Sequence, residues 1–427
     1  MSNIVCAPMA QLPPAGRVGG LRFELYGPGQ PGIGTAGKSL VRDVVESGLA
    51  PNARAWDFLS IALSVLCADE GVLRGLSPDG WTREIDLSIA VADPAFWTGQ
   101  GEALESLLAF LTGDRWSLRF TAGGAFPPAL DGDREERPED CVCLLSGGVD
   151  SLAGAVTLAH NGHRPFVVSQ IARGDKEHQA DFAAGIGGGL RGLQTNHQIK
   201  SPGTREISQR GRSIIFIAYG LLAATSLDSH RAGERVTLFI PENGFISINA
   251  PLTPLRLGSL STRTTHPVYL QRLQSLLDAA ALRVDLVNPF RYMTKGEVLL
   301  NCPDPATLTR FVFDSTSCGR FARKYRHCGR CVPCLVRRAA FLKWGHADVT
   351  TKGYIYDNIS INDHDHHFFE DVRSVGMAIE AVKQHGLTDW LGATLNAAEL
   401  GDVADYEALV GRGLEELEVF MRRANAL

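Results

Sequence analysis

The chain has 427 residues, with 42 Lys and Arg residues against 47 Asp and Glu residues, which gives a formal net charge of −5. At about 150 residues per domain, this length predicts two or three domains. The hydrophobic fraction of 44% and the charged fraction of 21% are ordinary for globular proteins and exclude a disordered or fibrous chain. The mildly acidic balance argues against a protein whose main partner is a nucleic acid.

Neither a membrane segment nor a secretory signal is expected. The longest apolar stretch, residues 214–224, is well short of the roughly 20 residues that a membrane span needs. The N-terminal sequence has no cationic region followed by an apolar one, so we expect a cytoplasmic location and no membrane partner. Nine cysteines in a reducing compartment are expected to stay free of disulfides, and a cluster of them would indicate a metal or a catalytic group.

Residues 1–130 are predicted to form an α+β extension. Apolar and polar residues alternate in several segments, which is the pattern of a half-buried strand, and other segments have the spacing of an amphipathic helix. The predicted strands are residues 21–26, 84–91 and 116–120, and the predicted helices are residues 55–68 and 101–111. No set of nucleophiles, bases or metal ligands is clustered in this part. The polar run 131–140, which contains a proline, is predicted to be a solvated linker.

Residues 141–345 alternate strands with helices, which predicts an α/β fold with a parallel sheet covered by helices on both faces. The predicted strands are residues 141–145, 166–168, 236–240 and 283–287, and the predicted helices are residues 152–159, 176–184, 212–227 and 268–281. Residues 346–427 are predicted to be a helical C-terminal region, with amphipathic helices at 368–384 and 406–423.

The sequence Ser146-Gly-Gly-Val-Asp-Ser151 lies directly between a predicted strand and a predicted helix. The first turn of a helix has unpaired N–H groups and a partial positive charge, so it attracts phosphate. Gly147 and Gly148 let the backbone approach an anion closely, and Ser146 and Ser151 add hydroxyl donors. Asp150 is expected either to cap the helix or to help hold Mg²⁺. This position between a strand and a helix favours a phosphate loop over a simple turn.

The four cysteines Cys318, Cys328, Cys331 and Cys334 have the spacing of a metal site. Four thiolates satisfy tetrahedral Zn²⁺ with no open position, and such a site would hold residues 318–334 together as a zinc knuckle. An iron–sulfur cluster is the alternative, because three cysteines at this spacing with a fourth nearby could also ligate one. The other five cysteines are scattered along the chain, and we expect them to be ordinary buried or surface residues.

Two further clusters are less specific. Residues 318–343 contain eight Lys and Arg residues and no acid, so this segment is either a solvated basic face or a site for phosphate, a carboxylate or an RNA backbone. The second cluster contains His364, His366 and His367 among Asp residues. Three neighbouring imidazoles in one loop do not readily converge on one ion, so we expect a polar loop here rather than a metal site.

Residues 141–345 resemble the QueC family, the 7-cyano-7-deazaguanine synthases, whose fold contains the PP-loop of ATP pyrophosphatases. The resemblance rests on several segments: Ser146–Ser151, Arg210-Gly-Arg212 at a predicted helix start, Pro241–Gly244 after a predicted strand, Asn288–Glu297, and Ser315–Cys318 with Cys328–Arg337. Residues 171–178 match the family only loosely. The flanking regions are absent from the plain synthase. A QueC-like core with such extensions resembles the QatC family, the QueC-like proteins of Qat anti-phage defence operons.

The resemblance implies a function as well as a fold. It implies an ATP-dependent C–N ligase that uses Mg²⁺, contains Zn²⁺ and activates the carboxylate of 7-carboxy-7-deazaguanine as an adenylate. Residues 146–151 would hold the pyrophosphate. Asp150 with Lys295, Arg210 or Arg212 would act at the reacting phosphate. The amine acceptor would be ammonia, which leads to the amide or nitrile, or a protein partner from the same defence operon.

Two other functions stay open from the sequence. The first is a tRNA-modifying PP-loop enzyme such as a thiolase, which would need a reactive cysteine pair. The second is a degenerate nucleotide-binding adaptor that assembles a defence complex. The intact sequence from Ser146 to Ser151 argues against the adaptor.

Overall fold

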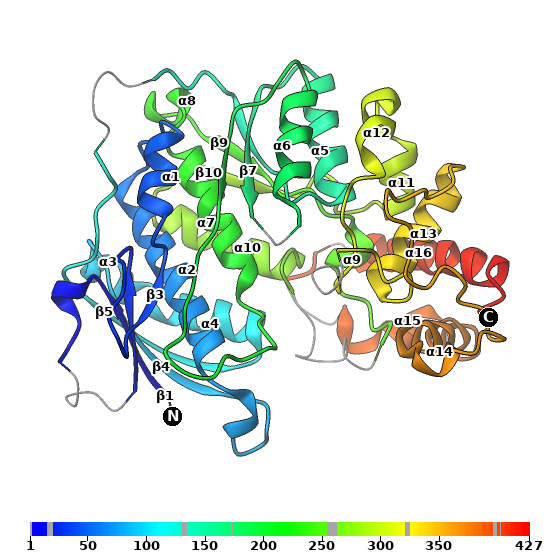
Figure 1. The fold of residues 1–427 in the computed structure, drawn as a ribbon, viewed down its shortest axis with the longest axis horizontal. Coiled ribbons are helices and arrows are strands. Elements are labelled where there is room, and N and C mark those ends of the chain that lie inside the picture. The colour runs from blue at the N-terminus through cyan, green and yellow to red at the C-terminus, as the bar shows by residue number, and fades with distance from the viewer. Residues whose placement is uncertain are drawn as a thin grey trace.

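The structure is a computed structural model, and it describes residues 2–14, 20–129, 135–171, 174–253, 263–320, 325–395, 399–401 and 403–427. These residues form two parallel five-stranded sheets and a group of C-terminal helices (Figure 1). The coarse prediction of an α/β fold with a helical C-terminal region is therefore confirmed. Among the described residues, no helix has both the length and the apolar character that crossing a membrane requires.

The N-terminal sheet has the strand order β3-β2-β1-β4-β5, and every pairing in it is parallel. Its strands are β1 (Ser2–Ala7), β2 (Leu21–Leu25), β3 (Gly34–Ala36), β4 (Glu84–Ala90) and β5 (Arg115–Thr121). The prediction of an α+β unit is wrong here, because helices connect β3 to β4 and β4 to β5. These are α1 (Leu40–Glu46), α2 (Ala53–Gly71), α3 (Pro94–Gly99) and α4 (Gly101–Thr112).

The second sheet has the order β10-β9-β6-β7-β8 and is also wholly parallel. Its strands are β6 (Cys141–Leu144), β7 (Pro165–Gln170), β8 (Gly192–Thr195), β9 (Val236–Phe239) and β10 (Val284–Val287). Helices α7 (Arg212–Ala224) and α10 (Pro267–Ala279) cover one face, and α5 (Val149–His160) and α6 (Lys176–Gly185) cover the other. Both faces are thus covered, as the sequence pattern predicted. Strands β7 and β8 are added on one side of β6, and β9 and β10 are added on the other side. The direction in which the sheet grows therefore reverses between β6 and β9.

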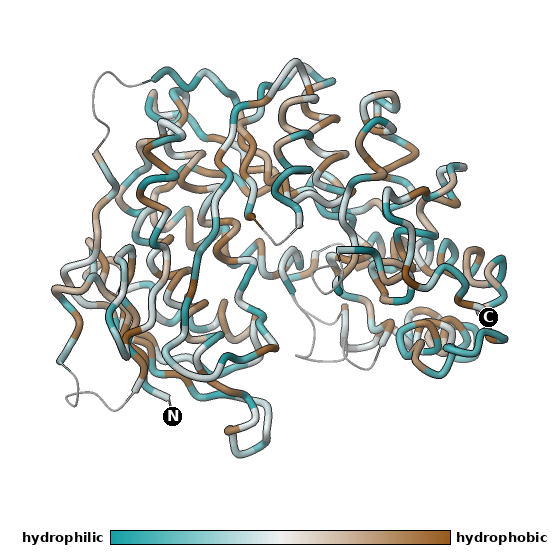
Figure 2. The backbone as a smooth tube through the Cα atoms, in the orientation of Figure 1, coloured by the Kyte–Doolittle hydropathy of each residue, from teal (hydrophilic) through white to brown (hydrophobic). Residues whose placement is uncertain are grey.

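Helices α2 and α7 lie between the two sheets and belong to one continuous hydrophobic core. Almost every residue of α2 is buried, because one side contacts the N-terminal sheet and the other contacts α7. The buried serines of this helix have hydrogen-bond partners: Ser64 Oγ donates to Ser60 O at 2.7 Å, and Ser60 Oγ lies 2.8 Å from Tyr26 Oη. Figure 2 shows hydrophobic residues, in brown, along the strands and in the helices that pack against them.

The C-terminal helices pack on the opposite end of the second sheet unit. Helix α13 (Val332–Trp344), α14 (Glu370–His385), α15 (Leu387–Leu391) and α16 (Val403–Arg423) share a second hydrophobic core with the short helix α9 (Gly244–Ser247). Two other helices, α11 (Lys295–Leu300) and α12 (Pro305–Val312), lie between this group and α5. In Figure 1 α11 and α12 lie above the orange and red C-terminal helices, and α13 contacts α11.

Part of the predicted linker is buried. Residues 131–134 lie outside the described residues, but Arg137 and Glu139 are among the buried charged residues. The backbone N–H of Arg137 donates to Asp228 Oδ2 at 2.7 Å, and Arg191 Nε donates to Glu139 Oε1 at 2.7 Å. Arg137 and Glu139 are therefore held in the fold, while the other residues of 135–140 are exposed, as expected for a linker.

Candidate functional site

The predicted phosphate loop lies at the carboxyl end of β6, immediately before α5. In a parallel sheet of this kind, ligands bind at the carboxyl ends of the strands where the strand order reverses. That point lies between β6 and β9, so the loop is at the position that this fold favours for an anionic ligand. Gly147 has φ +88°, which favours glycine and lets the backbone turn into α5.

The two loop serines mainly hold the loop in shape. Ser151 Oγ accepts from the backbone N–H of Ser146 at 3.1 Å and contacts the Gly148 carbonyl at 3.0 Å. Ser146 Oγ lies 3.0 Å from Ser151 Oγ and accepts from the Gly148 N–H at 3.3 Å. The hydroxyls therefore fix the approach of the backbone to a ligand.

Asp150, on the first turn of α5, contacts Lys295 across the site. Lys295 Nζ donates to Asp150 Oδ2, and Asn243 Nδ2 donates to the same oxygen at 3.0 Å. Burial alone would raise the pKa of Asp150, but Lys295, Glu242 and Asn243 lower it below its ordinary value. Asp150 is therefore held ionised although it is buried. The structure brings these two predicted site residues together from positions far apart in the sequence.

Glu242 lies three residues after the end of β9 and was not among the predicted site residues. Asn243 Nδ2 donates to both carboxylates, at 3.2 Å to Glu242 Oε1 and 3.0 Å to Asp150 Oδ2. The other oxygen of Asp150, Oδ1, is buried and has no hydrogen-bond partner among the described residues. Asp150 Oδ1 and the Glu242 carboxylate, beside the predicted phosphate loop, are oxygen ligands of the kind that Mg²⁺ prefers. The position of Glu242 in the loop that follows β9 was the signal in the sequence that could have identified it.

A cavity of about 320 Å³ connects these groups. One side is formed by the phosphate loop with Asp150, and the other by Glu242 and Lys295. The third side comes from the segment that enters the cysteine cluster, Thr316 to Gly319, with Pro333 at the start of α13. The cavity is thus lined by the phosphate loop, both carboxylates, one lysine and the edge of the knuckle.

The four predicted metal ligands converge. All four cysteines are buried, and their sulfur atoms lie within 4.8 Å of one another. Cys318 Sγ is 3.9 Å from Cys331 Sγ, and Cys328 Sγ is 3.9 Å from Cys334 Sγ. Tetrahedral Zn²⁺ with Zn–S bonds of about 2.3 Å would separate its sulfurs by about 3.8 Å. The donor set and its spacing therefore fit a structural zinc ion.

Backbone N–H groups further support thiolates at this centre. The N–H groups of Arg320 and Cys328 donate to Cys318 Sγ at 3.3 Å, and the N–H of Cys331 donates to Cys328 Sγ at 3.3 Å. Such bonds favour the ionised sulfur that a metal requires. The neighbouring His327 is not a ligand, because its Nε2 accepts from the Ser317 N–H at 3.1 Å.

The segment that leads into the cysteine cluster contacts the predicted phosphate loop. The backbone N–H of Thr316 donates to the Gly147 carbonyl at 2.9 Å, and Thr316 Oγ1 donates to Asp175 Oδ1 at 2.9 Å. On the other side, Gln179 Nε2 donates to the Ser146 carbonyl at 3.0 Å. A metal at the cluster would therefore also fix one wall of the candidate nucleotide site.

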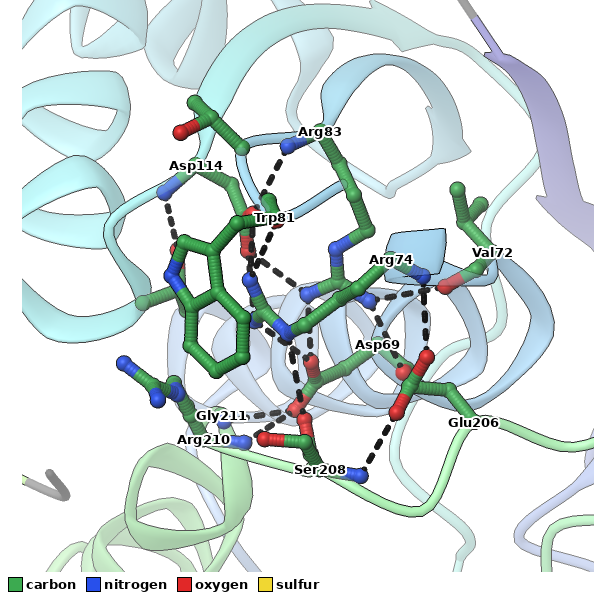
Figure 3. A network of polar contacts seen from close by, with 12 residues as sticks. Asp69, Val72, Arg74, Trp81, Arg83, Asp114, Glu206, Ser208, Arg210 and Gly211 are labelled. Carbon is green, nitrogen blue, oxygen red and sulfur yellow. Dashed lines mark hydrogen bonds and ion pairs between the residues drawn. The ribbon is translucent and has the colours of Figure 1, made fainter. Parts of the chain in front are cut away.

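Arg210 and Arg212 do not line the cavity. Arg210 is buried in a network between the N-terminal unit and the loop before α7, with its guanidinium 4.5 Å from the Trp81 ring (Figure 3). Its backbone N–H donates to Asp69 Oδ2 at 2.6 Å, and burial lowers the pKa of Arg210 to about 10. Arg212 is exposed at the first residue of α7. The prediction that either acts at the phosphate is not supported by this placement.

Most of the basic segment is committed to packing. Arg337 is buried and donates to Asp348 and to the Ser315 carbonyl, Arg338 Nη2 donates to the Asp357 carbonyl at 2.7 Å, and Lys343 Nζ lies 3.1 Å from Glu416. Arg323 and Lys324 lie outside the described residues. The described part of the segment therefore anchors the cysteine cluster and α13.

The three clustered histidines do not converge on one point. His364 is exposed and lies 3.5 Å from Asp365 Oδ2, whereas the His366 and His367 rings face Phe369 and Phe368. Asp363, His364 and Asp365 nevertheless place three possible ligand atoms within 4.8 Å of one another.

Searches of protein-family models, of curated proteins and of solved structures return no match for this chain. The function is therefore argued from the site itself.

Proposed function

We propose that this protein is an ATP-dependent C–N ligase that activates a carboxylate as an acyl-adenylate and releases pyrophosphate. The observation that carries the proposal is the placement of the loop Ser146–Ser151, which lies at the reversal of strand order with Asp150, Glu242 and Lys295 around one cavity. A lysine with two carboxylates beside a phosphate loop is the set of charges that a nucleotide triphosphate with its metal requires.

In this mechanism the substrate carboxylate oxygen attacks the α-phosphorus of ATP. The bond from that phosphorus to the bridging oxygen breaks, and its electron pair leaves with pyrophosphate, which the N–H groups of the phosphate loop and the first turn of α5 hold. Lys295 neutralises charge that develops on the phosphates, while Asp150 keeps the lysine ammonium in place. Asp150 and Glu242 would hold Mg²⁺, which supplies further charge neutralisation when bound.

The acyl-adenylate then reacts with an amine. The amine nitrogen attacks the acyl carbon, AMP leaves with the electron pair of the C–O bond, and the amine loses a proton. On the resemblance to the QueC family, we propose that 7-carboxy-7-deazaguanine is the substrate whose carboxylate is activated. Ammonia would then be the acceptor that gives the amide or nitrile. The resemblance to the QueC-like proteins of Qat operons proposes a protein amine instead, with a role in anti-phage defence.

The test is pyrophosphate release from ATP, Mg²⁺ and 7-carboxy-7-deazaguanine. We expect release by the wild type, a loss of at least about 100-fold in Asp150→Ala, since one charge contact of this kind supplies several kcal/mol, and no change in Asp181→Ala, an exposed aspartate on α6. No release by the wild type, or equal release by Asp150→Ala, would overturn the proposal. Mass spectrometry of partner proteins then separates conjugation from nitrile formation.

The structure weighs against a thiolase. All nine cysteines are buried, and four of them converge on one candidate metal centre. A thiolase needs an accessible cysteine pair for sulfur transfer. The ligase is therefore the better-supported function for this site.

A further inference from the structure

The first turn of α11 carries Lys295 into the candidate site. Thr294 is the N-cap residue of this helix, and its Oγ1 accepts from the Glu297 N–H at 3.1 Å while Glu297 Oε2 accepts from the Thr294 N–H at 2.8 Å. Lys295 is the first helical residue between them, and its ammonium contacts Asp150. The orientation of this single turn therefore decides where the Lys295 ammonium lies.

Both residues of this capping box are also held by α16. Glu416 accepts from Thr294 Oγ1, and Arg412 Nε donates to Glu297 Oε1 at 2.7 Å. Arg412 Nη2 also donates to the Tyr292 carbonyl at 2.8 Å, two residues before the N-cap. Arg412 and Glu416 are four residues apart, so they lie on the same face of α16. The turn that carries Lys295 is thus held at both ends by one face of α16, a helix that is far from it in the sequence.

Backbone spacing shows how closely the two helices approach. A Cβ atom on Gly296 would lie 2.8 Å from Glu416 Oε2, closer than real Cβ atoms come to a neighbour. The position next to Lys295 is therefore occupied by the Glu416 carboxylate. Glu416 is itself buried, at 8% exposure, and Lys343 of α13 lies 3.1 Å from it.

We propose that Glu416 and Arg412 of α16 are positioning residues that set the location of the Lys295 ammonium. In this role the C-terminal helical region does not line the cavity but holds the turn that places Lys295 in it. The proposal rests on the proposed function for its effect on catalysis, but its geometric content can be measured without ATP.

The direct test is the reactivity of lysine amines in the full-length protein. Wild-type Lys295 is buried against Asp150, so it should react slowly with a trace of acetic anhydride, as read by mass spectrometry. We expect Glu416→Ala to raise Lys295 acetylation several-fold and Glu416→Gln to restore most of the protection, because its amide oxygen can still accept from Thr294. Glu415→Ala changes an exposed neighbour on the same helix and is the matched control.

A second variant guards against simple loss of folding. Gly296→Ala keeps every charge but presses a methyl group against Glu416, and it should also raise Lys295 acetylation. Hydrogen exchange of β6 amides, measured in parallel, distinguishes local displacement from general loosening. Equal Lys295 acetylation in Glu416→Ala and Glu415→Ala, or a rise matched by faster exchange throughout β6, would overturn the positioning role.

Pyrophosphate release provides the catalytic arm. A displaced Lys295 should lower kcat by about 10-fold or more in Glu416→Ala, with partial rescue in Glu416→Gln and a smaller effect on KM for ATP. If the wild type releases no pyrophosphate while acetylation still separates the variants, the proposed function fails and the positioning role stands. If pyrophosphate release is normal in every variant, Glu416 does not position a lysine that the reaction uses, and the proposal fails.

Discussion

At the scale of single residues, backbone N–H groups that follow strands of the two sheets have different partners. Both sheets have the same relative strand order, in which the first strand lies between the second and the fourth. In the N-terminal sheet, Asp57 of α2 accepts from the N–H groups of Ala92 and Asp93 and from Trp97 Nε1, at 2.7 to 3.0 Å. These donors at the end of β4 are already satisfied by a carboxylate of the protein. The loop after β6 instead lines a cavity, and the N–H groups of Ser146 and Gly148 donate to the hydroxyls of the loop's own serines.

The Glu242 carboxylate gives a prediction of metal dependence. Because Asn243 donates to both Glu242 and Asp150, replacing Glu242 by Gln should remove one metal ligand without removing the lysine contact. We expect Glu242→Gln to raise the Mg²⁺ concentration for half-maximal pyrophosphate release by about 10-fold, the effect of one lost ligand interaction worth roughly 1.4 kcal/mol. An exposed acid, Glu177→Gln, is the control, and equal Mg²⁺ curves for both variants would refute a role in metal binding.

His266 gives a prediction of pH dependence. Burial, with a smaller effect of Arg263, lowers the pKa of His266 from 6.5 to about 4, and its Nδ1 accepts from the Val268 N–H at the start of α10. Below pH 6.5 the unfolded chain binds a proton that the folded chain does not, so stability is present above pH 6.5 and is lost as the pH falls towards 4. One such group can account for about 3 kcal/mol.

Urea unfolding at pH 7.5 and pH 5 measures this loss. His266→Asn keeps an oxygen acceptor at the N-cap but cannot be protonated in this range. We expect its urea midpoint to fall less between the two pH values than that of the wild type. An unchanged difference would show that other groups dominate the pH dependence.

At the scale of elements, the segment that leads into the cysteine cluster also forms part of the cavity wall. Thr316, two residues before the first cysteine of the cluster, contacts both the phosphate loop and Asp175. Burial raises the pKa of Asp175, although the Thr316 hydroxyl partly offsets this. The knuckle and the loop are separate motifs in the sequence, but they share one wall of a cavity in the fold.

Zinc removal should therefore affect nucleotide binding as well as stability. We expect the wild type to contain one zinc per chain and Cys331→Ser to lose most of it, as measured by elemental analysis. The same variant should bind ATP with a Kd raised by at least about 10-fold, because Thr316 would no longer be held, which corresponds to about 1.4 kcal/mol. Cys302→Ser, a buried cysteine outside the cluster, is the control. An unchanged zinc content would refute the metal site.

At the scale of the whole molecule, the two sheets are joined by a buried polar network as well as by the shared core. Asp69 of α2 contacts Arg83 at 2.6 Å and accepts from the Arg210 and Gly211 N–H groups at 2.6 and 2.7 Å. Arg83 in turn contacts Asp114 at 2.6 Å (Figure 3). The network links the N-terminal unit to the segment that begins α7 of the second sheet unit.

Removing Asp69 should weaken both units together. Asp69→Ala leaves Arg83 short of one partner and two backbone donors buried without an acceptor, which should cost about 3 to 5 kcal/mol of unfolding free energy. Hydrogen exchange should show equal loss of protection in β4 and β9, because one core contains both. Loss confined to β4 would show that the units unfold separately. Asp181→Ala should leave both strands unchanged.

Much of the second sheet unit could be predicted from its residue pattern. Strands such as Cys141–Leu144 and helices such as α5 and α7 lie within a few residues of their predicted bounds, because buried apolar runs and helical periodicity are local signals. The strands β1, β3 and β8 were missed. Two of them have only three or four residues, too few to show a period, and they are strands because neighbouring strands pair with them.

The sequence alone located two candidate functional groups in this protein. Four cysteines at metal-ligand spacing and a glycine-rich loop between a strand and a helix are local patterns, so they can be read before the fold is known. Only the tertiary structure decided which distant residues join them. It brought Lys295 and Glu242 to Asp150, and it placed Arg210 in a structural network and Glu416 behind Lys295. These pairings span tens to hundreds of residues, and they depend on the strand order and helix packing, which no local pattern contains.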